Sequence, residues 1–570
     1  PATAPPRRDT RNLTPRTITG LGALVAIATV AVVATLAPRR APPLDPRRVI
    51  VWSAWNSPAD RSSDFVAERT DAAIRDALVR TGLVNVVLPA PVRAASSADA
   101  PDPRRIARET GAGMLVITSF HRLGDSLRLT ARILEASGDQ VRWVVPAAMP
   151  VSALDVSVDT VAGRVAGAFA ALLDPHYAWM PVATSPPTFQ AFAEFEQGTE
   201  LKLHNRPGDA LPHFERAATL DPTFTWAMLE IAIVRMNLGD RPGADSVIDM
   251  VNTQRDRLPP VQLHWLEWML AVRDEDWVRS YDALERAADL VPGRFLYGLA
   301  ENARWLNRPR RSLELLERLG PDGASGFGYW YLMADSYHQL GEHQRELDVA
   351  VRGRRRHPTH PTAVVVEARA RTALGDVAGA LALVDTMLAL PRDGRDTPGT
   401  MMLQIAEELK AHGHAAPAAQ LLDRAIAWFG AQPASAAASL IMRRQVARAV
   451  YDAGRWLVAD SLFRQLARDD RDGVADHRAM LGAIAAHRGD TTEARRWVAT
   501  LRRLSRSVNR PREDAILGQA RIMAVLGDGP ESVRLLREAL GGQGMDLHTD
   551  ADFARLAGEP QYQLFVRPKG

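Results

Sequence analysis

Ser126 is the side chain whose setting in the sequence is closest to that of a catalytic nucleophile. It lies in the stretch RLGDSLRLTARIL (122–134), directly after a glycine and an aspartate. A serine hydroxyl attacks an acyl carbon efficiently only when a histidine base, oriented by a third group, lies within hydrogen-bonding reach. Whether the chain is an enzyme therefore depends on the histidines and aspartates that follow.

The four letters Gly124-Asp125-Ser126-Leu127 match the signature of the GDSL serine esterases and lipases. That resemblance implies a serine soon after the first strand and a downstream Asp-x-x-His pair. Here the tetrapeptide lies in the middle of its domain, and His176 follows Asp174 by only two residues. The residues after Ser126 alternate between apolar and polar, as in a half-buried strand, and Gly-Asp favours a hairpin turn. A turn is favoured, and the esterase stays a remote alternative.

Two pairs of histidines are close enough in sequence to suggest a metal ion. His357 and His360 lie in RHPTHP, and His412 and His414 lie in AHGHA. Neither pair has the i, i+4 spacing with a glutamate that zinc peptidases use, and no third ligand is evident. The sequence therefore predicts no metal site and no cofactor.

The charges are nearly balanced, at 70 Lys and Arg against 67 Asp and Glu. Because both signs alternate along helical stretches, a solvated helix surface is favoured over a phosphate-binding face. The basic cluster RGRRR (352–356) ends a predicted helix, where positive charge complements the helix dipole. We therefore expect no nucleic-acid partner. The lack of cysteine excludes disulfides and thiolate metal sites.

An uncharged apolar run near the start predicts a transmembrane helix at 17–38. A bilayer crossing takes about 20 apolar residues. The run is longer than the apolar part of a cleaved signal peptide, about 7–15 residues, so an uncleaved anchor is favoured over that alternative. Residues 1–16 are rich in Pro and Arg and predict a disordered juxtamembrane segment, and residues 39–47 predict a linker.

Residues 48–175 have the pattern of a small α/β domain, in the order strand, helix, strand, helix, three strands, helix. Three pieces resemble the TolB amino-terminal-domain-like module: the stretch IARETGAGMLVITSFHRLGDSLRLTARIL (106–134), Trp143, and the helix leading to Leu172 and Leu173. The opening VWSAWN departs from the Pro-Phe pair usual in that module. The resemblance implies a domain that follows the membrane helix of bacterial signalling proteins.

Residues 188–545 repeat at about 34 residues, stretching toward 41 in the last third. The units start near Ala191, Thr225, Val261, Gly293, Phe327, Pro361, Gly399, Leu440, Ala475 and Glu513. A period near 34 with two helices per unit resembles the tetratricopeptide repeat. The predicted fold class is therefore mainly α: a tetratricopeptide-repeat α-solenoid of about ten repeats, preceded by the small α/β domain and one N-terminal transmembrane helix.

Small residues recur at the two places where the paired helices of each unit must approach closely. Nine of ten units have Gly or Ala at the eighth place, with Trp268 as the exception. Nine of ten have Ala or Ser at the twentieth place, with Glu346 as the exception. Small side chains let two helices pack at short distance. This register predicts that the repeats stack into one solenoid.

The resemblance to tetratricopeptide repeats also implies a partner-binding groove on the concave side. In that family the second, fifth, ninth and twelfth places of the first helix line the groove. Aromatic residues and arginine dominate binding hot spots. Carried onto this chain, these places give Arg294, Tyr297, Glu301, Arg304, Tyr331, Asp335, His338, Arg369, Arg444, Arg448 and Tyr451.

These patterns together predict a non-enzymatic, membrane-anchored scaffold or sensor region that binds a peptide or protein partner. Residues 546–570 break the period and should cap the last helix pair. The resemblance implies a bacterial protein, single-pass in the cytoplasmic membrane, with its folded part outside the cytoplasm. The alternative is the C-terminal, extracytoplasmic portion of a transmembrane Ser/Thr kinase or transcriptional regulator whose effector domain is absent here. No oligomeric state is predicted.

Overall fold

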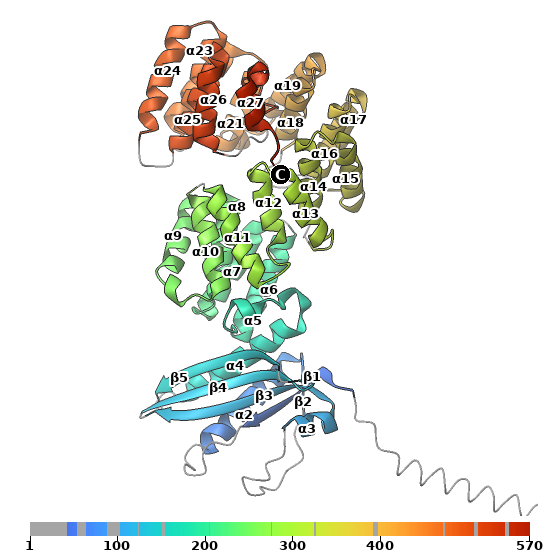
Figure 1. Cartoon of the computed structure of the whole chain (residues 1–570), viewed down its shortest axis with the longest axis vertical. Helices are drawn as coiled ribbons and strands as arrows, with labels where there is room; N and C mark the ends of the chain where they lie inside the picture. The colour runs from blue at the N-terminus through green and yellow to red at the C-terminus, as the bar shows by residue number, and fades with distance from the viewer. Residues whose placement is uncertain are drawn as a thin grey trace, which may run out of the picture. The chain divides into compact units, whose positions relative to one another are not determined.

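The computed structural model divides the chain into two compact units (Figure 1). The N-terminal unit comprises Pro1–Ala178 and Ser185–Phe189, and the repeat unit comprises Trp179–Thr184 and Gln190–Gly570. The structure describes residues 43–53, 64–87, 103–123, 125–138, 140–150, 154–204, 206–274, 276–323, 327–390, 397–470, 473–506, 511–541 and 547–569. The predicted membrane span at 17–38, with its flanking residues 1–16, lies outside the described residues.

A sheet with the strand order β2-β1-β3-β4-β5 forms the centre of the N-terminal unit. Its strands are β1 (Asp45–Ser53), β2 (Asn85–Val86), β3 (Ala112–Leu123), β4 (Ser126–Glu135) and β5 (Val141–Pro150). β1 pairs in parallel with β2 and β3, whereas β3, β4 and β5 form an antiparallel meander. Ser126 begins β4 opposite Leu123, as the hairpin interpretation of the GDSL letters requires.

Helices cover both faces of this sheet because its central strands are apolar on both sides. Thr118 of β3 donates a hydrogen bond to Asp71 of α2 (Asp64–Thr81) at 3.0 Å, which places α2 on one face. Ile50 of β1 and Leu115 of β3 lie on the other face of the sheet. There they cluster with Ile106 of α3 (Pro103–Thr110). The observed order of strands and helices is the predicted one.

Among the described residues, α4 (Leu154–Leu173) is the one helix long and apolar enough to cross a membrane. It lies in mid-chain rather than at the predicted position, and it packs against α2 and β5. Its apolar residues, including Val161, Val165 and Phe169, are buried in the unit. A place in the core therefore accounts for its composition.

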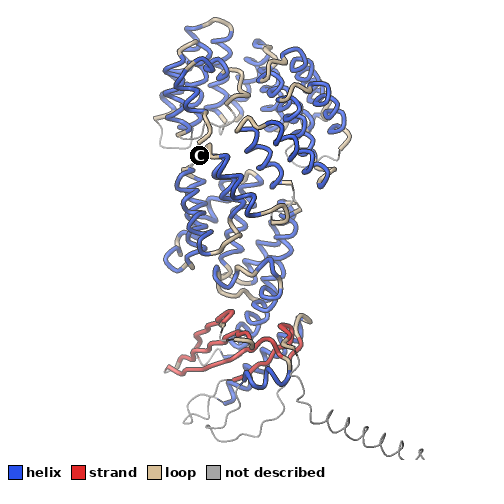
Figure 2. Tube along the Cα trace, turned by 45° about the vertical axis from the view of Figure 1, so that its right-hand side comes forward, coloured by secondary structure: helices blue, strands red, loops and turns tan. Residues whose placement is uncertain are grey.

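The described residues of the repeat unit are mostly helical (Figure 2) and form ten hairpins, each a first helix followed in the chain by a second. The first helices are α6 (Phe189–Leu203), α8 (Thr225–Leu238), α10 (Pro260–Arg273), α12 (Leu296–Trp305), α14 (Gly328–Gln339), α16 (Pro361–Ala373), α18 (Pro398–Ala411), α21 (Leu440–Asp452), α23 (Val474–His487) and α25 (Pro511–Leu526). The second helices are α7 (Pro207–Leu220), α9 (Arg241–Asn252), α11 (Trp277–Leu290), α13 (Pro309–Leu319), α15 (His343–Arg356), α17 (Val377–Leu388), α19 (Ala415–Gly430), α22 (Trp456–Asp469), α24 (Thr491–Leu504) and α26 (Gly529–Leu540). Short helical turns connect some of them, namely η4 (Arg255–Arg257) and α20 (Ala434–Ala437). Two others, η3 (Pro175–Tyr177) and α5 (Met180–Ala183), precede α6 in the sequence.

The predicted tetratricopeptide-type α-solenoid and the small domain before it are confirmed as the fold class. Of the ten predicted starts, that of the fourth unit, near Gly293, precedes its helix by three residues. The extra helix α20 follows the long α19 and accounts for the wider spacing of the units at Gly399 and Leu440.

The small residues that define the repeat register are buried between paired helices. Ala232, Ala300 and Ala368 at the eighth place have no exposed surface. A Cβ atom at Gly482 would lie 2.3 Å from Ile522 Cδ1 and 2.9 Å from Trp497 Cβ, closer than atoms tolerate. Helix contact at this distance leaves no room for a side chain, so these positions fix the register.

Glycine and aspartate form the turns inside several hairpins. Gly239 and Gly375 have φ of 81° and 82°, the left-handed conformation that ends the first helix at little steric cost. The next residues, Asp240 and Asp376, accept hydrogen bonds from the backbone N–H groups of Gly243 and Gly379 at 3.0 and 2.9 Å. Each aspartate thereby caps the second helix.

The C-terminal segment (547–569) packs on the last hairpin and then reaches a hairpin far back in the chain. Its helical parts are η5 (Phe553–Gly558) and α27 (Pro560–Val566), which contact α25 and α26. Beyond α27, the Lys569 N–H donates to the Asn307 carbonyl at 2.7 Å, and the Asn307 side chain donates to the Arg567 carbonyl at 3.0 Å. The predicted cap is thus also a strap between the last hairpin and α12.

Candidate partner-binding groove

A network of opposite charges joins three consecutive hairpins. Arg304 of α12 contacts Asp335 of α14 at 2.6 Å, and Arg369 of α16 contacts the second oxygen of that carboxylate at 2.7 Å. Arg369 also contacts Glu346 of α15 at 2.8 Å. The two carboxylates are buried, so these ion pairs hold the hairpins together from inside.

Both carboxylates of this network remain acidic despite their burial. Burial alone would raise the pKa of Asp335, but Arg304 and Arg369 outweigh it and lower that pKa to about 2. The pKa of Glu346 is also lowered to about 2, because Arg369 and hydrogen bonds from His338 and His343 outweigh the effect of its burial. Both groups are therefore anionic at neutral pH.

Histidines gather beside this network around a second buried glutamate, Glu408 of α18. His338 Nδ1 lies 2.8 Å from Glu346 Oε2, and His338 Nε2 lies 3.3 Å from Glu408 Oε1. His412 Nε2 lies 2.9 Å from the same Glu408 oxygen. Burial would raise the pKa of Glu408, but hydrogen bonds from His412 and His548 lower it well below its usual range.

Asp552 of the C-terminal segment is the centre of another polar cluster. It accepts hydrogen bonds from the Tyr451 hydroxyl at 2.6 Å and from Arg521 at 2.9 Å, and it lies 2.7 Å from His487 Nε2. These contacts outweigh its burial and hold its pKa well below the usual range. Side chains from α21, α23 and α25 thus all contact Asp552 of the C-terminal segment.

Between the two clusters, Arg448 of α21 contacts two carboxylates, those of Asp452 at 2.7 Å and Glu407 at 3.0 Å. Burial, with smaller contributions from the nearby Asp452 and Asp550, outweighs the effect of Arg448 and raises the pKa of Glu407 to about 7. Glu407 is therefore partly protonated at neutral pH. This carboxyl group faces a hollow in the inner side of the solenoid.

The hollow has a volume of about 540 Å³ and is formed by the first helices α18, α21, α23 and α25 with Phe463 of α22. Leu403, Phe463 and Met480 are buried and provide an apolar floor. Gln404 and Arg444 are exposed at its edge. Arg444 is held by Asp470 at 2.6 Å and keeps 44% of its side chain exposed.

The structure places four predicted residues of the fourth and fifth units in half-buried positions. Arg294 lies 5.0 Å above the Trp179 ring and 3.6 Å from Glu230. Tyr297, Glu301 and Tyr331 are half-buried. Burial raises the pKa of the Tyr297 hydroxyl and of the Glu301 carboxyl.

Four of the predicted groove residues do not form an open surface, which corrects the expectation from the repeat pattern. Arg304, Asp335, His338 and Tyr451 are each at most 5% exposed. Their partners are other side chains of the repeat unit or, for His338 and Tyr451, the C-terminal segment. Ion pairs and the C-terminal segment occupy this part of the inner side. Of the eleven predicted groove residues, Arg444 and Arg448 line the hollow described above.

Glu346, Glu408 and His548 were not predicted as site residues from the sequence, although Glu346 was noted as an exception to the repeat pattern. Glu346 is the exception at the twentieth place, where other units have Ala or Ser, and it is fully buried. A carboxylate at a small-residue position must be paired, so this departure from the pattern indicates a polar cluster. His548 has no comparable signal, because it lies outside the repeats.

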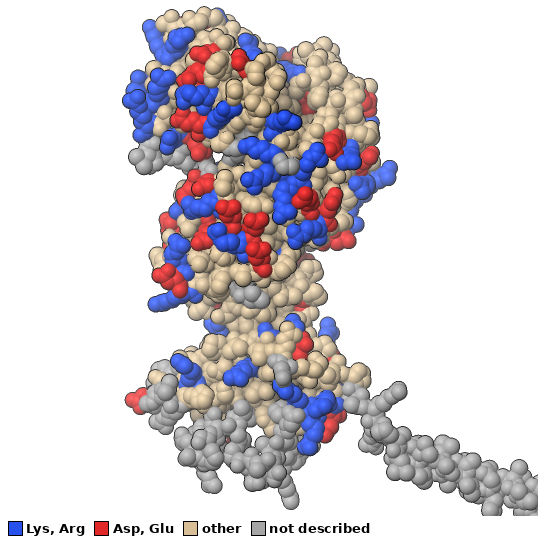
Figure 3. Space-filling view, viewed as in Figure 1, with Lys and Arg blue, Asp and Glu red and all other residues tan. Residues whose placement is uncertain are grey.

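The surface of the repeat unit carries both signs of charge. On the face visible in Figure 3, Lys and Arg are interspersed with Asp and Glu over the hairpins. Many of these are ion pairs on the surface, such as Arg424 with Asp385 at 2.8 Å. The distribution is that of a solvated helix surface.

No protein-family model matches the chain, and neither does any curated protein. Similar solved structures include Rap protein complexed with competence and sporulation factor (12% identity, 64% of this chain, 99% of that chain, TM-score 0.37). Others are human IFIT1 dimer with m7Gppp-AAAA (16%, 65% and 90%, TM-score 0.33) and a tetratricopeptide repeat protein from Parabacteroides merdae (12%, 52% and 98%, TM-score 0.27). At these identities and TM-scores the comparisons carry no inference about function.

Proposed function

We propose that the chain is a non-enzymatic scaffold that binds a peptide segment of a partner protein in the hollow of α18, α21, α23 and α25. The observation that carries this proposal is an open, mixed polar and apolar hollow that is lined by two of the predicted groove residues, Arg444 and Arg448. Ligand sites typically combine an apolar lining with a few fixed polar groups. Leu403 and Met480 provide the apolar lining, and Arg444 and Gln404 provide the polar groups.

The occupant that fits is an extended or helical peptide with one apolar side chain and nearby hydrogen-bonding groups. The apolar side chain would be buried on Leu403 and Phe463, while Arg444 and Gln404 would contact polar groups at the edge. Arg444 suits this role because Asp470 fixes its guanidinium without covering it. An arginine held in place loses less conformational freedom when it binds.

Filling the hollow should weaken binding. Peptides selected from a random library against the immobilised full chain are measured by fluorescence anisotropy. We expect Gln404→Trp to weaken them at least about tenfold, or about 1.4 kcal/mol, because the indole occupies the hollow. The matched control is Gln465→Trp, at an exposed position on the second helix α22. Unchanged affinity in Gln404→Trp, or an equal loss in the control, would place the peptide elsewhere.

We further propose that residues 17–38 anchor this scaffold in a bacterial membrane, with the folded units outside the cytoplasm. The uncharged run of 22 residues supports the anchor, and the resemblance of residues 48–175 to a TolB-like module supports the placement. The same resemblance supports a role as the sensor portion of a Ser/Thr kinase or regulator. Release of the full chain from membranes by alkaline carbonate, without detergent, would contradict the anchor.

A further inference from the structure

Four histidines and two glutamates from separate parts of the repeat unit converge at one point. They are His338, His343, Glu346, Glu408, His412 and His548. The chain brings them together through α14, α15, α18, the turn after α18, and the C-terminal segment. Four of them, His338, His343, His412 and His548, line a cavity of about 510 Å³.

The ligand atoms of three residues in this cluster lie at nearly the spacing of a tetrahedral metal site. His338 Nε2 lies 3.0 Å from His548 Nε2 and 3.3 Å from Glu408 Oε1, and His548 Nε2 lies 3.8 Å from Glu408 Oε2. Zinc bonds of about 2.0–2.1 Å in a tetrahedron separate neighbouring ligand atoms by about 3.3 Å. The two distances from His338 Nε2 lie close to that value, and His548 Nε2 is nearest to the other oxygen of the same carboxylate, at 3.8 Å.

The glutamate behind His338 fixes the imidazole for coordination. A carboxylate oxygen accepts hydrogen bonds, so His338 Nδ1, 2.8 Å from Glu346 Oε2, is the donor. Nε2 is then the nitrogen of His338 that is left to coordinate an ion, and it faces His548 and Glu408. A carboxylate behind a ligating histidine is the usual support of zinc sites, because it sets the tautomer and the orientation of the ring.

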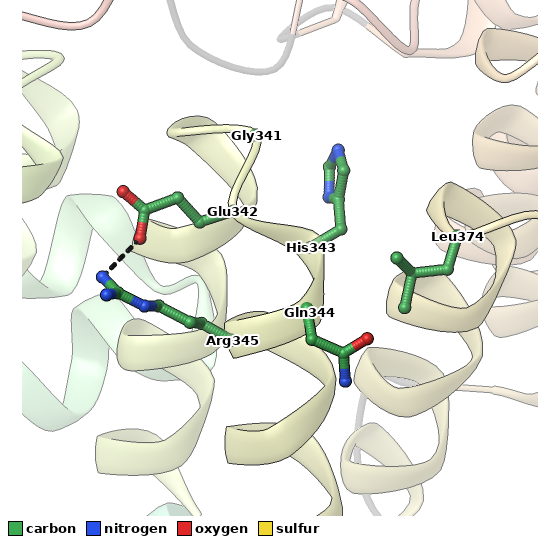
Figure 4. A pocket seen from close by; sticks show the side chains of 6 residues that line it. All are labelled: Gly341, Glu342, His343, Gln344, Arg345 and Leu374. Carbon is green, nitrogen blue, oxygen red and sulfur yellow. Dashed lines mark hydrogen bonds and ion pairs between the residues drawn. The ribbon is translucent and has the colours of Figure 1, made fainter.

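Two further histidines stand at the edge of the site. His412 lies 2.9 Å from Glu408 Oε1, and its ring centre is 5.5 Å from that of His343. Figure 4 shows His343 at the start of α15, with its imidazole directed away from the Glu342–Arg345 ion pair. Both side chains also line the cavity.

We propose that His338, Glu408 and His548 bind one Zn²⁺ ion, which fastens the C-terminal segment to α14 and α18. Imidazole nitrogens with a single carboxylate suit zinc, whereas Mg²⁺ and Ca²⁺ take oxygen ligands. The ion would join residues that are 210 positions apart in the sequence. This proposal is independent of peptide binding in the hollow.

The test uses the full chain, purified in detergent, stripped of metal with EDTA and desalted. Zinc chloride is added, and bound zinc is measured by elemental mass spectrometry after gel filtration. Affinity is measured by competition with a chromophoric chelator. We expect one zinc per chain, with affinity at least about tenfold weaker in Glu408→Gln and in His548→Ala. The control His204→Ala changes an exposed histidine of the repeat unit and should bind like the wild type.

A second readout separates coordination from folding. Co²⁺ bound in place of zinc should give the strong visible absorption of a four-coordinate ion, and this should be lost in Glu408→Gln while the far-ultraviolet circular dichroism is unchanged. A wild-type chain that binds less than stoichiometric zinc at micromolar concentrations would overturn the proposal. So would variants that retain wild-type affinity, because the zinc would then lie elsewhere.

Discussion

Replacing Arg369 with methionine should lower the free energy of unfolding by about 3–5 kcal/mol. Its guanidinium contacts Asp335 at 2.7 Å and Glu346 at 2.8 Å, and neither carboxylate is more than 3% exposed. Without Arg369, Asp335 keeps Arg304, but Glu346 keeps only His338 and His343. Removing one partner of a buried ion pair leaves buried charge that is poorly compensated, and losses of this size are typical. Methionine keeps the length of the side chain, so the lost charge rather than a cavity dominates the effect. Urea unfolding followed by circular dichroism measures the loss.

The matched control is Arg424→Met, which removes an exposed ion pair with Asp385 at 2.8 Å. Surface pairs contribute about 0–1 kcal/mol, so this variant should be nearly as stable as the wild type. Equal losses in the two variants would show that the buried network contributes no more than a surface pair. The comparison isolates burial, because both changes replace an arginine by methionine.

The acid dependence of the same variant has a defined sign. The pKa of Glu346 falls from the ordinary 4.5 to about 2 in the folded chain, and that of Asp335 from 3.8 to about 2. Groups with a lowered pKa contribute stability above their unfolded pKa and lose it as the pH falls through the folded value. The difference in stability between wild type and Arg369→Met should therefore shrink as the pH falls from about 4.5 to about 2.

The repeat architecture could be predicted because its physical cause is local and periodic. Ala232 and Ala368 occur at the same place of their units, and each must be small for its helix to contact the next. Gly239 and Gly375 mark the turns for an equally local reason, since each adopts a positive φ. The order of strands and helices in the N-terminal unit was likewise readable from alternation, as in the residues after Ser126.

The candidate sites were less predictable because their partners are distant in sequence. The repeat pattern places Tyr451 on the inner side of the solenoid, but its hydroxyl meets Asp552, 101 residues later. His338 likewise meets His548, 210 residues later. Pattern analysis assigns a side chain to a face of the solenoid and does not show that a segment beyond the repeats covers that face.

The exceptions to the repeat pattern carried more information than its regular positions. Glu346 interrupts a column of alanine and serine, and it proves to bind Arg369, His338 and His343. Trp268 interrupts the other column and stacks on Trp265, with ring centres 4.5 Å apart. In a repeat array most positions serve packing, so a residue that breaks the packing rule must be stabilised by contacts specific to its own unit.

Phe553→Ala should detach the C-terminal segment from the last hairpin without unfolding the solenoid. Phe553 is 1% exposed and belongs to one apolar cluster with Leu556, Tyr562 and Phe565, and Arg521 lies 5.1 Å above its ring. Truncating a buried phenylalanine costs about 3–5 kcal/mol. The segment is short and docks through few such side chains, so a loss of this size should release it. Limited trypsin digestion should then cleave the variant within residues 547–569 much faster than the wild type.

The control is Leu564→Ala, on the same helix α27, where the leucine is 58% exposed and contributes little to docking. Its cleavage rate should match that of the wild type, and the circular dichroism of both variants should stay near the wild-type value. Slow cleavage of Phe553→Ala would mean that the polar contacts of Asp552 and Asn307 hold the segment without the apolar cluster. Fast cleavage would show that burial of the aromatic side chain keeps Asp552 and His548 on the inner face. Those two residues can reach their partners on α14 and α21 only while the segment is docked.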